Sequence, residues 1–133
     1  MPHTGSIEDQ LAIRGLVESY GDAVAQRDAA QWGACWADDA VWAILGQEIK
    51  GRDAIVGTWQ SMMDGFAFTA FNMSIGRIAV DGDRASLRVY VSEELWAKDD
   101  SVTRIKGQYD DELVRTPEGW RFARRNYAIL KTH

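Results

Sequence analysis

The spacing of hydrophobic residues changes once along the chain, from a helical period to a strand period. Between Ile7 and Arg27 apolar residues recur every three or four positions and charged residues fall mostly on the other side, which predicts an amphipathic helix. Ser6, with the acidic Asp9 three positions later, is a suitable N-cap. Asp28 then predicts the start of a second, short helix. One face of this helix carries Trp32, Cys35 and Trp36.

The middle of the chain predicts a short strand and a third helix. Residues 40–45 form an apolar run that stops at Gly46, which favours a strand over so short a helix. After residues 51–53, helical spacing returns at Ile55, Trp59, Met62 and Phe66. From Phe66 onward the period is two, and turn signals separate four long strand candidates. They cover residues 66–80, 84–98, 102–115 and 120–131.

This order of elements defines the expected fold. Helices first and strands afterwards predict an α+β domain in which a cone-shaped, curved antiparallel sheet wraps around the N-terminal helices and encloses a pocket. At 133 residues the chain has room for one domain, 1–133, with residues 1–6 expected to be disordered.

Charge and composition limit the classes of binding partner that we expect. The formal net charge is -5 and the basic residues are scattered except for Arg124 and Arg125, so we expect no nucleic-acid partner. No apolar run approaches the ~20 residues that span a bilayer, and residues 1–6 lack the features of a signal peptide. With a single cysteine, Cys35, an internal disulfide is excluded. We therefore expect a cytoplasmic protein that does not bind membranes.

The positions of histidine exclude several kinds of chemistry. The chain has two histidines, His3 and His133, both in terminal segments. Catalytic triads, Cys-His pairs, histidine general bases and histidine metal sites are therefore not expected. We predict no metal and no cofactor, so any chemistry depends on carboxylates, tyrosines, amides or arginines.

Five segments, in this order, carry a resemblance to a known family. They are the helix stretch 12–23, Trp36-Ala37-Asp38-Asp39-Ala40-Val41-Trp42, Gly51-Arg52-Asp53-Ala54-Ile55, Val80-Asp81-Gly82-Asp83-Arg84-Ala85 and Gly119-Trp120-Arg121-Phe122-Ala123-Arg124-Arg125. Together they resemble the SnoaL-like branch of the nuclear transport factor 2-like superfamily, which includes polyketide cyclases, scytalone dehydratase, hexachlorocyclohexane dehydrochlorinase and ketosteroid isomerase. The resemblance implies a cone that holds a small apolar molecule and commonly forms a homodimer.

The catalytic residues of these relatives are missing here. The dehydratase and dehydrochlorinase pattern has an Asp at the end of the first helix and a His on the strand after the third helix. These positions correspond to Ala25 and Phe71. The proton-shuttling Asp of ketosteroid isomerase corresponds to a position near Ile44. The resemblance therefore leaves open whether the chain is an enzyme.

One carboxylate interrupts an apolar strand face. Glu93 shares its parity with Ala85, Leu87, Val89, Val91 and Leu95. Burial there would raise the pKa of Glu93 and suit it to proton transfer. Alternatively, a bulge near residues 92–94 turns Glu93 outward, or an arginine pairs with it.

The next two strands supply further candidates. Tyr109 and Asp111 share the parity that converges with Glu93, so Asp111 is the reserve catalytic residue. In the last strand the matching parity holds Arg124 and Asn126, which makes Arg124 the expected partner of Asp111 and Asn126 a ligand contact. A structural Asp111–Arg124 ion pair is the alternative to a catalytic Asp111.

Aromatic side chains provide the expected pocket wall. The predicted substrate-binding residues are Tyr20, Trp42, Trp59, Phe66, Phe71, Tyr109 and Asn126. Trp42 and Phe71 are favoured because the pocket positions of the family correspond to them. Ordinary core packing is the alternative for every ring, and Cys35 is expected to be an inert core thiol.

Three functions remain open at this point. The first is a cofactor-free lyase, isomerase or cyclase that acts on an aromatic, steroid-like or polyketide compound. The second is a non-catalytic module that binds a small molecule, and the third is an accessory small subunit of a ring-hydroxylating oxygenase. For each we expect a homodimer built through the outer sheet face, because Tyr90 and Trp96 have outward parity.

Overall fold

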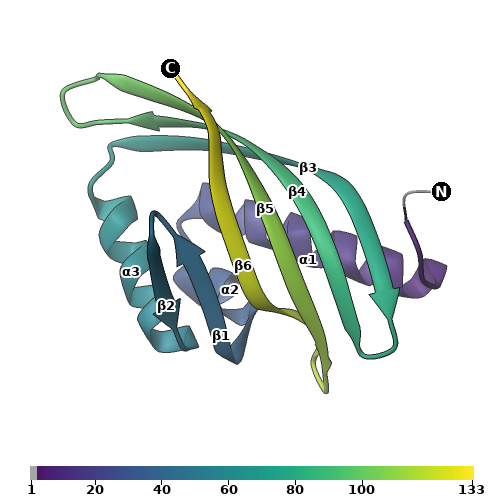
Figure 1. Ribbon diagram of the computed structural model, residues 1–133. Helices are drawn as coiled ribbons and strands as arrows, with labels where there is room; N and C mark the ends of the chain where they lie inside the picture. Colours follow the sequence, from purple (N-terminus) through teal and green to yellow (C-terminus); the bar gives the residue numbers. More distant parts are fainter. Residues whose placement is uncertain (1–2) are drawn as a thin grey trace.

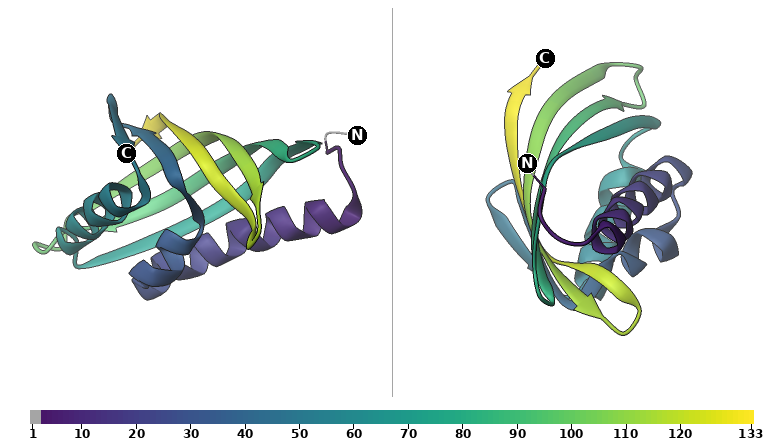
Figure 2. Two further views of the ribbon diagram at one scale, coloured as in Figure 1. Left: turned by 90° about the horizontal axis from the view of Figure 1, so that it is seen from below. Right: turned by 90° about the vertical axis from the view of Figure 1, so that its right-hand side faces the viewer.

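The computed structural model describes residues 3–133 and has the expected α+β architecture (Figure 1). The elements are α1 (Ile7–Gln26), α2 (Ala29–Ala34), β1 (Trp36–Ile44), β2 (Gln47–Lys50), α3 (Arg52–Asp64), β3 (Phe68–Asp81), β4 (Arg84–Trp96), β5 (Val102–Thr116) and β6 (Gly119–Thr132). The helices lie on the concave side of one curved, unclosed sheet (Figure 2). The helix-then-strand order and the curved sheet are confirmed.

The sheet has the order β2-β1-β6-β5-β4-β3. Strands β3 to β6 form the predicted antiparallel meander. The prediction of an antiparallel sheet is wrong for β1, which pairs in parallel with β6 because the chain crosses over through α3 and the meander before it returns. The sequence also missed β2, whose four residues are too few to show a period of two.

Two element boundaries differ from the predicted ones. Trp36 begins β1 instead of sharing a helix face with Trp32, and Phe66 lies beyond the end of α3. Both residues are hydrophobic and adjoin a helix, so periodicity extended the helices too far. The structure contains no helix long and apolar enough to cross a membrane within residues 3–133.

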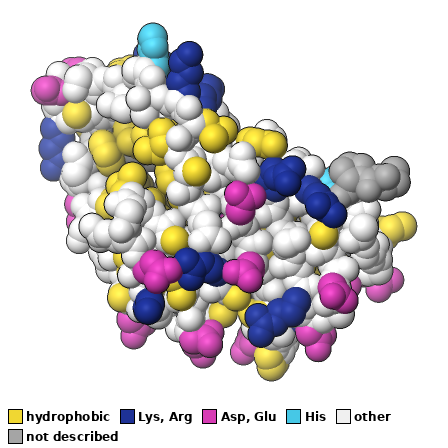
Figure 3. All heavy atoms as spheres, viewed as in Figure 1, with side chains coloured by type: hydrophobic (Ala, Val, Ile, Leu, Met, Phe, Trp, Pro, Cys, Tyr) yellow, Lys and Arg dark blue, Asp and Glu magenta, His cyan; other side chains and the backbone are white. Residues whose placement is uncertain are grey.

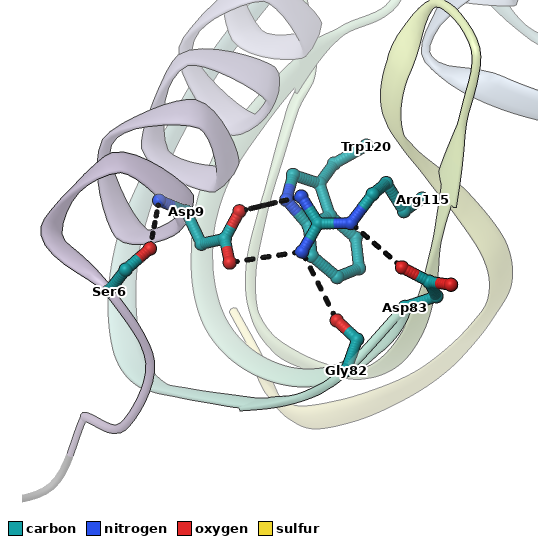
Figure 4. A network of polar contacts seen from close by, with 6 residues as sticks. All are labelled: Ser6, Asp9, Gly82, Asp83, Arg115 and Trp120. Carbon is teal, nitrogen blue, oxygen red and sulfur yellow. Dashed lines mark hydrogen bonds and ion pairs between the residues drawn. The ribbon is translucent and has the colours of Figure 1, made fainter.

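The beginning of α1 is fixed to the turns of the sheet by a polar network (Figure 4). Ser6 is the N-cap, as predicted, and its hydroxyl accepts a hydrogen bond from the backbone N–H of Asp9 at 3.0 Å. The Asp9 carboxylate binds the Arg115 guanidinium at 2.8 and 3.0 Å and the Trp120 indole N–H at 3.2 Å. Arg115 also contacts Asp83 and lies over the Trp120 ring, so this network closes one end of the curved sheet.

The segment before α1 lies along the edge strand β3. Thr4 forms a parallel bridge with Ala79, and its backbone N–H donates to the carbonyl of Ile78 at 2.9 Å. The Ile78 N–H in turn donates to Nδ1 of His3 at 3.0 Å. Residues 3–6 thus have defined contacts, in contrast to the predicted disorder of residues 1–6, of which residues 1–2 lie outside the described part.

Aromatic rings fill the space between the helices and the sheet. Trp32 stacks on Trp59 with centroids 4.6 Å apart, and Tyr20 lies against Trp32 at 5.5 Å and Trp36 at 6.3 Å. All four side chains are buried. These aromatic residues therefore stabilise the hydrophobic core, because each large ring removes a wide apolar surface from water.

The outer sheet face is largely polar. Tyr90 is 43% exposed there and Trp96 is half-buried. Ion pairs cross the same face, among them Arg104 with Glu94 at 2.8 Å. Association of two chains through this face stays a prediction.

Replacing Asp9 by Asn should remove an acid-sensitive part of the stability. Hydrogen bonds from Arg115 and Trp120 lower the pKa of Asp9 to about 2, below the ~3.9 of an unfolded aspartate. The unfolded state therefore binds the proton more strongly, so the contribution is present above about pH 4 and is lost as the pH falls toward about 2. We expect the thermal unfolding midpoint of Asp9→Asn to lie below that of the parent chain at neutral pH. The difference between the two midpoints should narrow as the pH falls from about 4 toward about 2.

The matched control is Asp81→Asn, which removes an exposed carboxylate at the end of β3. We expect its midpoint to stay close to that of the parent chain. A gap for Asp9→Asn that stays constant with pH would contradict the assigned role of the network.

Candidate functional site

A β-bulge in β6 determines which side chains face the helices. Leu113 of β5 is opposite Phe122 and the preceding Glu112 is opposite Arg124, so Ala123 is an extra residue in β6. Strand parity inverts at this point. Trp120 and Phe122 are buried before the bulge, and Arg125 is buried after it.

The bulge corrects two sequence predictions. Arg124 and Asn126 do not face the interior, because the extra residue moves them to the other side of the sheet. Arg124 instead binds Glu48 of β2 and donates from Nε to Oδ1 of Asn126 at 2.8 Å. The Asn126 amide donates to the carbonyl of Asp110. The basis for Asn126 as an interior ligand contact is therefore wrong.

Asp111 pairs with Arg125, not with Arg124. Nε and Nη2 of Arg125 each donate to one carboxylate oxygen of Asp111 at 2.9 Å, and both side chains are fully buried. The guanidinium lies 3.6 Å from the Tyr109 ring centroid and 4.6 Å from that of Tyr20 on α1. This bidentate pair joins two strands to the long helix in the centre of the core.

Burial and charge have opposite effects on this pair. Burial raises the pKa of Asp111 to about 6, against the lowering influence of Arg125. Burial lowers the pKa of Arg125, but the negative charge of Asp111 outweighs it, so the net direction is upward. We infer that both groups are charged at neutral pH, because a neutral Asp111 would leave a buried guanidinium without a counter-ion. Nη1 of Arg125 is also buried and has no partner among residues 3–133.

Glu93 lies where its parity predicted, with a tyrosine as its partner. The pairing of β4 with both neighbours continues without a shift through residues 92–94, so no bulge turns Glu93 outward. The Tyr127 hydroxyl donates to Oε1 of Glu93 at 3.2 Å. Burial raises the pKa of Glu93, and the hydrogen bond from Tyr127 partly offsets this rise. Within residues 3–133, no cation forms a hydrogen bond or an ion pair with Glu93.

Two further rings extend this contact into the core. The Tyr109 and Tyr127 rings lie 4.7 Å apart, and the Tyr109 hydroxyl accepts a hydrogen bond from the Trp42 indole at 3.4 Å. Trp42, Tyr109, Tyr127 and Glu93 thus form a continuous row from β1 across β6 and β5 to β4. The row ends at Glu93, near the end of the sheet at which β3 begins after α3. We call this end, opposite the Asp9–Arg115 network, the open end (Figure 1).

The predicted aromatic residues occupy different depths. Tyr20, Trp42, Trp59 and Tyr109 are buried, whereas Phe66 and Phe71 are half-buried. Phe71 is the strand partner of Glu93 and lies 6.1 Å from Tyr20 between ring centroids. Most of the predicted rings therefore pack into one core that adjoins Glu93, and Phe66 contributes no ring contact there.

The open end carries exposed apolar side chains and a small hollow. Leu45, Phe68, Ile129 and Leu130 are between 42% and 66% exposed. Figure 3 shows hydrophobic side chains gathered between the β1–β2 hairpin and the far end of β6. A hollow of about 120 Å³ on the outer face is lined by Ala70, Asn72, Ser92, Glu93, Glu94, Arg104 and Lys106. The Glu93 side chain, which binds Tyr127, is half-buried.

The resemblance to the dehydratases assigns the family's catalytic positions to Ala25 and Phe71. Ala25 is exposed near the end of α1 and Phe71 has no ionisable group. Cys35 is buried, and burial raises the pKa of its thiol to about 11, as expected for an inert core residue. Arg125 and Tyr127 were missed by sequence reasoning, because a bulge leaves no signal in the hydrophobic pattern of β6.

Comparisons with known proteins agree with this architecture. Residues 5–126 match the SnoaL-like domain family. An uncharacterized protein from Mycobacterium tuberculosis is 35% identical over 130 residues, which cover 94% of this chain and 88% of that protein. The structure of a candidate aromatic ring hydroxylase from Novosphingobium aromaticivorans has a TM-score of 0.87 at 27% identity, with 96% of this chain and 93% of that chain covered.

A second structure from Novosphingobium aromaticivorans, of a candidate scytalone dehydratase, also has a TM-score of 0.87. It is 22% identical and covers 96% of this chain and 87% of that chain. At this identity the likeness concerns the fold.

Replacing Asp111 by Asn should destabilise the protein strongly. The variant leaves the Arg125 guanidinium buried without its counter-ion, for which we expect a loss of about 3–5 kcal/mol in the free energy of unfolding. Urea denaturation at neutral pH measures it. The double variant Asp111→Leu/Arg125→Met removes both charges and should recover much of the loss.

The control is Asp110→Asn, which removes the exposed neighbouring carboxylate that lies 3.9 Å from Arg88. We expect a change of about 0–1 kcal/mol for this surface pair. An Asp111→Asn variant as stable as Asp110→Asn would show that the buried pair is not needed by the fold.

Proposed function

Because the chain belongs to the SnoaL-like family, we propose that it takes up a small apolar or aromatic molecule at the open end of the sheet and transforms it without a cofactor, as a lyase, isomerase or cyclase. The observation that carries this proposal is Glu93, a half-buried carboxylate on an apolar strand face with a tyrosine hydroxyl as its partner. A carboxylate in this setting is suited to both accept and return a proton.

The environment of Glu93 differs from that of Asp111. Arg125 keeps Asp111 in a fully buried bidentate ion pair, which occupies both carboxylate oxygens and gives Asp111 a structural role. Glu93 has a neutral donor, Tyr127, and its pKa is raised by burial. Burial raises the pKa of both carboxyl groups, so the difference between them lies in their partners and their access. Asp111 is fully buried and fixed by two hydrogen bonds from Arg125, whereas Glu93 is half-buried and has one hydrogen bond from a neutral hydroxyl, which suits Glu93 to proton transfer.

The proposed step moves one proton. Glu93 accepts it from a C–H bond of the bound molecule, and the electron pair of that bond forms a new double bond. In an isomerase the proton returns from Glu93 to a different atom. In a lyase the electrons expel a leaving group from the neighbouring carbon, and the proton leaves with that group or to water. The Tyr127 hydroxyl orients the carboxylate throughout.

The surroundings favour an aromatic ligand with an oxygen acceptor. Exposed apolar side chains at the open end, among them Phe68 and Leu130, favour an apolar molecule. Nη1 of the fully buried Arg125 has no hydrogen-bond partner among residues 3–133, so a ligand that enters the core from the open end would meet a donor suited to a carbonyl or phenol oxygen. The names of the two structural relatives, a candidate aromatic ring hydroxylase and a candidate scytalone dehydratase, accord with this ligand class.

A non-catalytic binding module is the second candidate. It is favoured by Ala25 and Phe71, which stand where the dehydratase resemblance places catalytic residues. A binder needs rings and amides but no ionisable group within reach of its ligand. Catalysis by Glu93 is therefore the difference between the two candidates.

Tryptophan emission should report ligand binding. Fused-ring aromatic compounds are expected to quench the emission, and Trp59→Phe should reduce the quenching because Trp59 belongs to α3 next to the open end. Trp120→Phe is the control, because Trp120 belongs to the network at the closed end (Figure 4). A thermal-shift screen in which only phosphorylated or highly charged compounds stabilise the fold would contradict the proposed ligand class.

Replacing Glu93 by Gln should abolish proton transfer but keep the shape of the site. With a compound that the parent chain converts, detected by mass spectrometry of the product, we expect a rate loss of about 100-fold or more. Ligand affinity should be largely kept. Glu94→Gln is the matched control, because its carboxylate binds Arg104 on the outer face.

Stability gives an independent measurement on the same variant. Burial raises the folded-state pKa of Glu93, so the folded state binds the proton more strongly and its stability falls as the pH rises above the unfolded value of ~4.3. Glu93→Gln should therefore lose this decline and be the more stable chain at neutral pH. Unchanged turnover in Glu93→Gln would rule out Glu93 as the catalytic residue, whereas a parent chain that binds its ligand and converts no compound would favour the binding module.

A further inference from the structure

Tyr127 and Glu93 belong to strands that are not neighbours. Tyr127 is on β6 and Glu93 on β4, with β5 between them. Adjacent strands lie about 4.8 Å apart, so the Tyr127 side chain has to cross β5 to place its hydroxyl 3.2 Å from the carboxylate. The residue of β5 under this crossing is Gly107.

Gly107 leaves no room for any other residue while Tyr127 is in this position. A Cβ atom on Gly107 would lie 2.5 Å from both Cε1 and the hydroxyl oxygen of Tyr127 and 2.7 Å from Cζ. Gly107 is itself buried and is paired with Val91 of β4 and Ile129 of β6. A glycine inside a long strand weakens that strand, and its presence is typical of a place where another group approaches closely.

We propose that Gly107 is a positioning residue: its missing side chain lets Tyr127 lie across β5 and hold the Glu93 carboxylate in the orientation for proton transfer. This inference rests on the proposed function of Glu93. Any side chain at position 107 displaces the end of the tyrosine, so the hydrogen bond to Glu93 is lost. The atoms that must move belong to the end of one side chain, and we therefore expect Gly107→Ala to fold.

The groups around Glu93 determine whether its pKa rises or falls when the hydrogen bond from Tyr127 is lost. Tyr127 donates to the carboxylate, and the Tyr109 ring lies 4.7 Å from the Tyr127 ring. Arg104 and Lys106 border the hollow on the outer face. On β3 its strand partner Phe71 is uncharged. Since the hydrogen bond from Tyr127 lowers the pKa of Glu93, its loss should raise that pKa and leave the other groups in place.

The experiment is a pH titration of the Glu93 side-chain carboxyl by carbon-13 NMR, assigned with Glu93→Gln. We expect the pKa of Glu93 to rise in Gly107→Ala and in Tyr127→Phe, and the double variant to show no further rise. Gly57→Ala is the control, because a Cβ on Gly57 of α3 meets no atom within 4 Å. It should titrate like the parent chain.

Turnover gives the second measurement. The acidic limb of the kcat profile should move to higher pH in both variants, and kcat at lower pH should fall by about tenfold with KM nearly kept. A purely structural glycine would change stability without moving this limb. If the NMR pKa rises but no compound is converted, the inference on positioning holds and the proposed function fails. If Tyr127→Phe raises the pKa of Glu93 and Gly107→Ala does not, the role of Gly107 is overturned.

Discussion

The buried ion pair between Asp111 and Arg125 is the constraint on which the rest of the site depends. Two charges without solvent are tolerated only when each is matched closely, and here one guanidinium meets both oxygens of one carboxylate. The remaining faces of the guanidinium lie against aromatic rings from α1, β5 and β6. The position of the long helix over the sheet is therefore coupled to this buried pair, in addition to the Asp9–Arg115 network at the beginning of the helix.

The same bulge that places Arg125 inside also places Tyr127 inside, two residues later. One extra residue, Ala123, thus supplies both the charge that neutralises Asp111 and the hydroxyl that reaches Glu93. The two carboxylates end in different environments, although both belong to apolar strand faces. A cation holds Asp111 in place, while Glu93 has a weaker, neutral partner and is only half-buried.

The sequence predicted what depends on regular periodicity. The long helix with its Ser6 cap, the antiparallel meander and the inward direction of Glu93 all follow from residue spacing, and the structure confirms them. The sequence could not predict features that depend on one inserted residue or on the geometry of a crossover connection. Strict alternation through Ala123 predicts an inward Arg124 where the structure has an inward Arg125, and the parallel pairing of β1 with β6 has no local signal.

The two edges of the open sheet are protected in different ways. The edge strand β2 is short and ends in Glu48, Ile49 and Lys50, a composition that discourages pairing with another chain. The other edge, β3, is long, and the segment at Thr4 covers part of it. The Thr4 backbone N–H donates to the Ile78 carbonyl, and the Thr4 hydroxyl accepts from the Val80 N–H. An affinity tag or a truncation at the start of the chain would therefore act on an aggregation-prone edge, and a tag placed after β6 would leave that protection intact.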